Sequence, residues 1–227
     1  MQVLHRDSLP LGGFAGLREH RLVTDSRAFG AHKSPSTFDG LGNFIYLADA
    51  RFNPKGETGM HPHHEIDVIS VMVEGRIEHE GSLEHGKGLI AGDVQVQRAG
   101  GEGFSHNEVN PNDTKNRMIQ LWALPDESGQ PSGYMHYSPK NFGTTRIYGG
   151  DKNQKETFDN HTHIDIVNLA AGETFNLPIE SLNYVTVGNA LFSSGDESAQ
   201  ANDGSLIREV DLHIQAKTDT QIIVISQ

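Results

Sequence analysis

The 227-residue sequence contains no cysteine and a single tryptophan. The absence of cysteine excludes disulfides, iron–sulfur clusters, thiolate metal sites and cysteine nucleophiles. Any metal ion bound by this protein must therefore be held by nitrogen and oxygen ligands. A chain of this length can bury a sizeable core without covalent cross-links.

The chain also lacks basic runs and long apolar runs. It has 18 Lys and Arg against 30 Asp and Glu, and its formal net charge is −12. Nucleic-acid binding depends on cations that displace counterions from phosphates, so we expect no direct nucleic-acid partner. The longest mostly apolar run, 66–73, is far shorter than a membrane-spanning helix of about 20 residues. Because the first residues also lack the apolar stretch of a signal sequence, we expect a soluble, cytoplasmic protein without a membrane partner.

Helical periodicity is scarce, and short β-branched segments recur between turns that contain glycine, asparagine and proline. Many short strands with turns every 8–12 residues or so are typical of β-sandwiches and barrels. The pattern predicts an all-β fold with strands at 44–52, 66–73, 76–80, 93–97, 117–124, 163–169, 184–192, 206–210 and 220–226.

A short internal repeat suggests two related domains. The tripeptide Gly-Glu-Thr occurs at 56–58 and again at 172–174, and each copy lies between two predicted strands. A chance match of three residues is the alternative. The most loop-like stretch, 126–133, lies just past the middle of the chain. We therefore expect two tandem antiparallel β-barrels, an N-terminal domain at 1–133 and a C-terminal domain at 134–227.

The two copies differ in the residues that follow the repeat. His61 and His63 follow the first copy, whereas the same alignment places Leu177 and Ile179 after the second. We therefore expect the N-terminal domain to bind a metal ion and the C-terminal domain to be a degenerate copy without one.

Two pairs of polar residues predict the metal site. His61 and His63 lie two residues apart, so in a strand both point to one side, and Pro62 keeps the chain extended. His106 and Glu108 repeat this spacing. Three imidazoles and one carboxylate suit Fe(II), Mn(II), Co(II), Ni(II), Cu(II) or Zn(II) better than calcium or magnesium. Four ligands would leave two positions of an octahedral ion open for substrate or dioxygen. Surface histidines without a metal are the alternative.

The remaining histidines are expected to lie outside this site. His64 would point away from His63 in a regular strand, which favours an exposed or supporting role. His79 and His85 flank a predicted hairpin, and we expect both to be solvated. A second His-x-His pair at 161–163 precedes its Gly-Glu-Thr copy and has no His-x-Glu partner downstream.

Three other residues near the proposed ligands are assigned simpler roles. Trp122 is expected in the core. Asp67 is expected to be an ordinary polar residue, or to fix the tautomer of a ligand histidine through a hydrogen bond. Glu102 lies in a glycine-rich turn, where we expect a bulge before the strand of His106.

Residues 56–124 resemble the pirins, a branch of the two-barrel cupins. The motifs that carry the resemblance, in the order of the family, are His61–Pro62–His63, Asp67, Glu74–Gly75, Glu78–His79, Gly92–Asp93–Val94–Gln95, Ala99–Gly100 and His106–Asn107–Glu108. The resemblance implies a bicupin of jelly-roll type whose metal ligands are His61, His63, His106 and Glu108. The sequence departs from the family at Asp67, where pirins usually have glutamate, and at His64, where arginine is common.

Proteins that resemble pirins include enzymes that cleave the flavonol quercetin with dioxygen. This implies a small aromatic substrate, O2 and one divalent metal, with Fe(II) expected and Mn, Ni, Cu, Co or Zn as alternatives. Glu108 would be the catalytic base that accepts a hydroxyl proton. Other pirins are metal-dependent regulators, which implies a regulatory protein partner and no turnover. A cupin isomerase or sugar-binding protein is a third interpretation, which the position of Glu108 after the third histidine disfavours.

Overall fold

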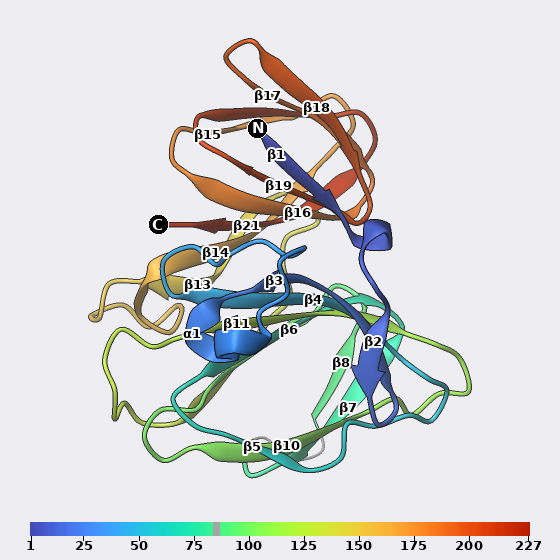
Figure 1. Ribbon diagram of the computed structural model, residues 1–227. Coiled ribbons are helices and arrows are strands. Elements are labelled where there is room, and N and C mark those ends of the chain that lie inside the picture. Colours follow the sequence, from blue (N-terminus) through green and yellow to red (C-terminus); the bar gives the residue numbers. More distant parts are fainter. Residues whose placement is uncertain (84–86) are drawn as a thin grey trace. The chain divides into compact units, whose positions relative to one another are not determined.

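The computed structural model describes residues 1–83 and 87–227, whose regular secondary structure is almost entirely β-strand (Figure 1). The chain divides into two compact units. The N-terminal unit comprises Leu9–Ser138, and the C-terminal unit comprises Pro139–Gln227 together with Met1–Ser8. The predicted all-β class is confirmed, whereas the expected domain boundary after residue 133 stays a prediction.

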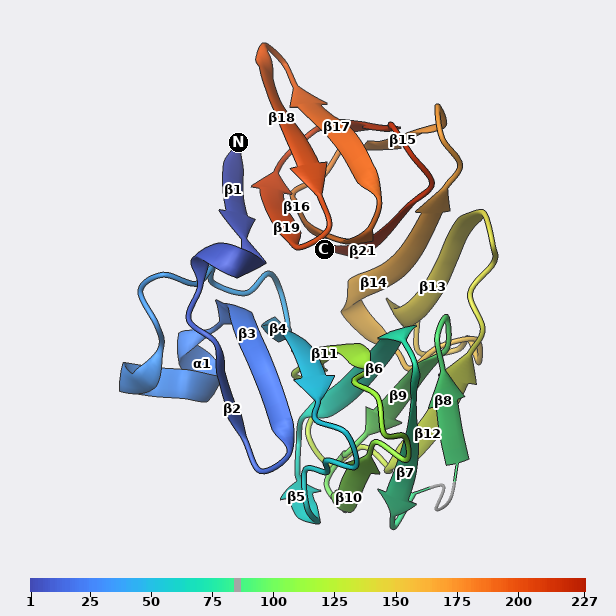
Figure 2. The same cartoon turned by 90° about the vertical axis from the view of Figure 1, so that its right-hand side faces the viewer.

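The N-terminal unit consists of two antiparallel sheets. The larger sheet has the order β12-β9-β6-β11-β4-β3-β2 and the smaller one the order β5-β10-β7-β8. In Figures 1 and 2, β5 and β10 lie across this unit from β3, β4 and β11. The strands are β2 (Gly12–Phe14), β3 (Leu17–Thr24), β4 (Phe44–Phe52), β5 (His61–His63), β6 (Asp67–Glu74), β7 (Arg76–Gly81), β8 (Lys87–Ile90), β9 (Val94–Arg98), β10 (Phe104–Val109), β11 (Arg117–Ala123) and β12 (Gly133–Tyr137). Between β3 and β4 lie the short helices α1 (Ser26–Phe29) and η2 (Gly30–His32).

The C-terminal unit repeats this arrangement. Its larger sheet has the order β1-β19-β16-β21-β14-β13 and its smaller one the order β15-β20-β17-β18. The elements are β1 (Gln2–His5), η1 (Arg6–Ser8), β13 (Gly143–Gly150), β14 (Asn160–Leu169), β15 (Thr174–Leu177), β16 (Ser181–Val187), β17 (Asn189–Ser194), β18 (Glu197–Asn202), β19 (Ser205–Glu209), β20 (Leu212–Ala216) and β21 (Thr220–Ser226). In the described residues the two sheets of each unit do not join into a closed barrel, so each unit is an open jelly-roll-type sandwich.

Apolar side chains fill the space inside each sandwich. In the N-terminal unit, one cluster contains Leu17, Ala50, Phe52, Met72, Ile77, Leu89 and Met118. These residues come from both sheets, so their burial holds the smaller sheet against the larger one. No helix in the described ranges has the length and hydropathy needed to cross a membrane.

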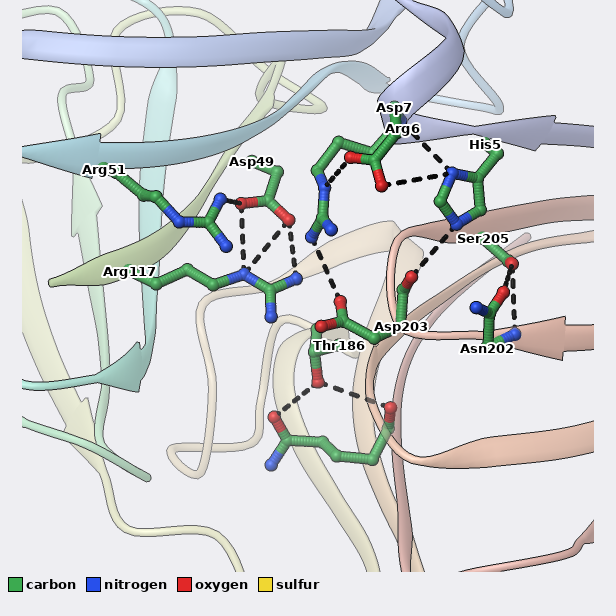
Figure 3. Close-up of polar contacts among 11 residues, drawn as sticks. His5, Arg6, Asp7, Asp49, Arg51, Arg117, Thr186, Asn202, Asp203 and Ser205 are labelled. Atoms are coloured by element: carbon green, nitrogen blue, oxygen red, sulfur yellow. Dashed lines mark hydrogen bonds and ion pairs between the residues drawn. The ribbon is translucent and has the colours of Figure 1, made fainter.

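The larger sheet of the N-terminal unit also buries a charged group. The Arg117 side chain is 1% exposed, and its Nη2 donates to Asp49 Oδ2 at 2.6 Å, while Arg51 Nη1 lies 3.2 Å from Oδ1 (Figure 3). A carboxylate shared between two guanidinium groups compensates the cost of removing Arg117 from water. In the C-terminal unit, Arg6 forms a partly buried ion pair with Asp203, at 3.1 Å (Figure 3).

One predicted strand, 184–192, is wrong in extent. The segment contains the end of β16, a turn at Gly188 and the start of β17. Gly188 has φ +86°, and a Cβ atom there would lie 2.2 Å from the carbonyl oxygen of Asp219. Glycine therefore allows a tight turn within a stretch whose apolar residues continue on both sides.

The strand registers relate the two units. His61 pairs with His106 across β5 and β10, and Leu177 pairs with Leu212 across β15 and β20. His61 and Leu177 each lie three residues after the threonine of a Gly-Glu-Thr copy. Apolar residues therefore stand in the C-terminal unit where the N-terminal unit has histidines. The predicted lack of a metal in the C-terminal unit stays a prediction.

Candidate metal centre

Three histidines of β5 and β10 converge on one point. The Nε2 atom of His106 lies 3.1 Å from that of His61 and 3.2 Å from that of His63. The ring centroids of His61 and His63 are 4.9 Å apart. Two nitrogens bound about 2.1 Å from one ion at right angles would lie about 3.0 Å apart. The spacing of the three imidazoles therefore fits a single metal ion, and these residues form a cluster able to hold one.

Hydrogen bonds fix the tautomers of two of these rings. His61 Nδ1 lies 2.8 Å from the carbonyl oxygen of Gly59, which can only accept, so Nδ1 carries the proton. His106 Nδ1 donates to Gln97 Oε1 at 3.0 Å, and Gln97 Nε2 donates to His79 Nε2 at 3.0 Å. In both histidines the lone pair of Nε2 is therefore free for a metal, as in metal sites oriented by an outer hydrogen bond.

The electrostatic environment keeps His63 and His106 neutral. Burial, reinforced by the neighbouring His61, lowers the pKa of His63 to about 4. Burial and the nearby His63, His61 and His79 lower the pKa of His106 to about 2. Neutral imidazoles are the form that binds metal ions, so the donor set fits a divalent transition metal at neutral pH.

Glu108 lies beside the histidines but makes other contacts. Its Oε1 accepts hydrogen bonds from Ser70 Oγ at 2.9 Å and Gln95 Nε2 at 3.2 Å. Burial raises the pKa of Glu108 to about 7, and the two hydrogen bonds offset part of this shift. The cluster itself comprises only the three histidines among the described residues, so Glu108 as fourth ligand stays a prediction.

The histidines and Glu108 line one cavity of about 340 Å³. Such a volume lies at the small end of the range for ligand pockets, about 300–1,000 Å³. Aromatic rings form much of the remaining wall. Trp122 stacks on Tyr46 at 4.3 Å between ring centroids and lies 6.1 Å from the ring of His63. Trp122, expected in the core, therefore lies half-buried in the wall of the cavity.

The structure changes the interpretation of several polar residues. His79 is buried, so the expectation that it is solvated was wrong. On β7 the buried residues are Ile77 and His79, an alternation that shows which face of the hairpin turns inward. His85 lies outside the described residues. His64 is exposed, as expected, and its Nε2 contacts the Gly101 carbonyl oxygen at 3.1 Å.

Other predicted residues do not join the cluster. Asp67 is buried and pairs with Arg98 at 3.3 Å. Glu102 lies in the turn before β10 and accepts a hydrogen bond from Ser132 Oγ at 2.9 Å. His161 and His163 lie on β14, in the C-terminal unit.

Sequence analysis assigned no role to the polar residues of β9 that support the site, although Gln95 belongs to one of the motifs of the resemblance. Gln95 and Gln97 are both fully buried in a five-residue strand, and each hydrogen bonds a side chain at the metal centre. Two glutamines that alternate with valines in this strand were the available signal. Their partners could not be read from it, because those partners lie on other strands.

An all-β chain of two similar sandwiches, with one histidine cluster in the first, defines a bicupin. The pirin family model matches residues 23–123. A Zymomonas mobilis protein named "Putative quercetin 2,3-dioxygenase" is 31% identical over 186 residues, which cover 78% of this chain and 79% of that protein. The chain belongs to the pirin family.

Solved structures share this fold over its full length. The nickel(II) complex of the bacterial pirin YhhW from Escherichia coli superposes with a TM-score of 0.83, at 20% identity, covering 99% of this chain and 97% of that one. A quercetin 2,3-dioxygenase from Acinetobacter baumannii superposes with a TM-score of 0.72, at 18% identity, covering 100% and 85%.

Proposed function

We propose that the N-terminal unit binds one divalent transition metal and that the protein is a dioxygenase acting on a flavonol of the quercetin type. The ligands would be His61, His63 and His106, joined by Glu108. The observation that carries the proposal is the convergence of three imidazoles in the wall of a cavity, where His106 Nε2 lies 3.1 Å from His61 Nε2 and 3.2 Å from His63 Nε2. The quercetin dioxygenase names of the relatives support the substrate class.

Iron(II) is the proposed metal, and Mn, Ni, Cu, Co and Zn are the alternatives. The nitrogen-rich donor set suits all of them, and the nickel(II) complex of a bacterial pirin is consistent with this range. When bound, the ion would supply the Lewis-acid and one-electron chemistry that a reaction with dioxygen requires. The cytoplasm remains the proposed compartment.

The residues of the cavity provide positioning and proton transfer. Glu108 lines the cavity, so its carboxylate could take the proton of a substrate hydroxyl. In the metal-free protein burial raises the pKa of Glu108 to about 7, so this carboxylate holds a proton more tightly than an exposed one. The rings of Tyr46 and Trp122 offer apolar faces to a planar substrate, which excludes water from that side.

The proposal is tested by loading the purified protein anaerobically with each metal. We expect one ion per chain, and loss of flavonol absorbance with release of carbon monoxide only when oxygen is admitted. His106→Ala should abolish metal binding and turnover, whereas His64→Ala, an exposed neighbour, should preserve both. Intact metal binding without turnover for every metal would favour the metal-dependent regulator with a protein partner instead.

A further inference from the structure

A charged pair on β3 forms part of the wall of the same cavity. Arg21 Nε donates to Glu19 Oε1 at 2.7 Å, and Arg21 Nη2 lies 2.7 Å from the same oxygen. The other oxygen of Glu19 accepts a hydrogen bond from the Tyr46 hydroxyl at 2.9 Å. The Glu19 side chain is 3% exposed, whereas that of Arg21 is 47% exposed.

These contacts leave Arg21 as the group available to a ligand. Both oxygens of Glu19 already accept hydrogen bonds, so this carboxylate mainly fixes the position of the guanidinium group. Two N–H groups of Arg21 serve Glu19 and the guanidinium group also interacts with the Tyr46 hydroxyl, but the Arg21 side chain stays 47% exposed and keeps further N–H donors. A guanidinium group held at one edge presents its free donors in a fixed plane, the geometry that binds a carboxylate.

The surroundings of Arg21 suit an anion attached to an aromatic ring. Its Cζ lies 6.0 Å from the ring centroid of Phe29, which is parallel to Trp122 within 4°. Trp122 in turn lies beside His63, so aromatic rings line the wall between Arg21 and the histidines. Arg21, Glu19 and Phe29 also line a second cavity of about 260 Å³, so Arg21 borders both cavities.

From this arrangement we infer that the cavity takes a planar hydroxylated aromatic acid whose carboxylate pairs with Arg21 while its hydroxyl groups face the three histidines. The second half of this statement rests on the proposed function. Arg21 then extends the substrate class from flavonols to hydroxylated aromatic acids, and it favours each acid over its own uncharged ester.

Trp122 provides the measurement, because it is the only tryptophan and lies in the cavity wall. Quenching of its fluorescence would give dissociation constants for 3,4-dihydroxybenzoate and 3,4-dihydroxycinnamate, each compared with its methyl ester. Zinc-loaded and metal-free protein would both be used, since zinc supports no redox turnover. We expect each acid to bind at least about tenfold more tightly than its ester, as a charge-assisted hydrogen bond would produce.

Variants locate the preference. Arg21→Gln should reduce the ratio of the affinities for acid and ester to about one. Arg21→Lys should leave an intermediate ratio, because lysine keeps the charge but lacks the paired N–H donors of a guanidinium group. The double variant Glu19→Gln/Arg21→Gln should also remove the preference for the acid, and it leaves no buried carboxylate unpaired. Arg18→Gln is the matched control, since Arg18 lies on the same strand, is exposed and is absent from the cavity wall.

Equal binding of acid and ester by the wild-type protein, or an acid preference that survives in the double variant, would overturn the inference. Failure of the proposed function is recognised separately. It would show as absence of oxygen-dependent turnover with every metal while the acid preference remains in metal-free protein. Turnover of quercetin together with equal binding of acids and esters would overturn only the role of Arg21.

Discussion

The buried carboxyl group of Glu108 should make the stability of the metal-free protein depend on pH. Burial raises the pKa of Glu108 from its ordinary value of 4.5 to about 7. A carboxyl group with a raised pKa holds its proton more tightly in the folded chain, so its contribution is complete below pH 4.5 and is lost as the pH rises towards 7. Each pH unit between these values corresponds to about 1.4 kcal/mol, which gives a total loss of about 3 kcal/mol.

The substitution Glu108→Gln isolates this effect. The amide is neutral at every pH, and its oxygen can still accept the hydrogen bonds from Ser70 and Gln95. Urea unfolding of chelator-treated wild type and variant from pH 5 to pH 8 would give the difference in unfolding free energy. We expect this difference to move by about 2–3 kcal/mol in favour of the variant. His63 and His106 titrate in both proteins, so their contributions largely cancel.

A matched control is Glu74→Gln, because Glu74 is an exposed carboxylate at the end of β6. The difference in unfolding free energy between Glu74→Gln and the wild type should stay constant from pH 5 to pH 8. If Glu108→Gln also gave a flat difference, the reasoning that the site holds a desolvated carboxyl group would be refuted.

Three further predictions concern the same unit. Gln97→Met removes the acceptor for His106 Nδ1 and should weaken metal binding about 10- to 100-fold in a chelator competition assay; unchanged affinity would contradict the orienting role. A metal ion at 100 times its dissociation constant should raise the unfolding free energy by about 2.7 kcal/mol in the wild type and not in His106→Ala. Asp49→Ala removes the carboxylate that pairs with the buried Arg117 and should cost about 3–5 kcal/mol in urea unfolding, whereas a cost below 1 kcal/mol would show that water or other groups solvate Arg117.

Strands with a continuous β-branched or aromatic pattern could be predicted from the sequence. The predicted ranges 44–52 and 220–226 coincide with β4 and β21, since central strands are buried on both faces and read as apolar runs. The turn at Gly188 was not predicted, because the apolar pattern of 184–192 continues from β16 into β17. Short strands such as β2 and β18 were missed because their residues are largely exposed and carry no hydrophobic pattern.

The histidine cluster could be predicted because it depends on a period of two within each strand and on one pairing between strands. To predict that His61, His63 and His106 converge, it was enough to assume that β5 and β10 are neighbours. Residues that act through more distant partners could not be predicted. Glu19 and Tyr46 meet through the register of β3 and β4, and local pattern does not specify that register.

The strand β5, which carries two of the three histidines, lies at the edge of its sheet, and among the described residues it pairs only with β10, through three residue positions. Edge strands are the parts of a sheet that open most readily. An ion bound by His61, His63 and His106 would cross-link the three-residue strand β5 to β10 and hold it in the sheet. Amide hydrogen exchange along β5 should consequently slow when metal binds, so that the backbone itself reports whether the centre is filled.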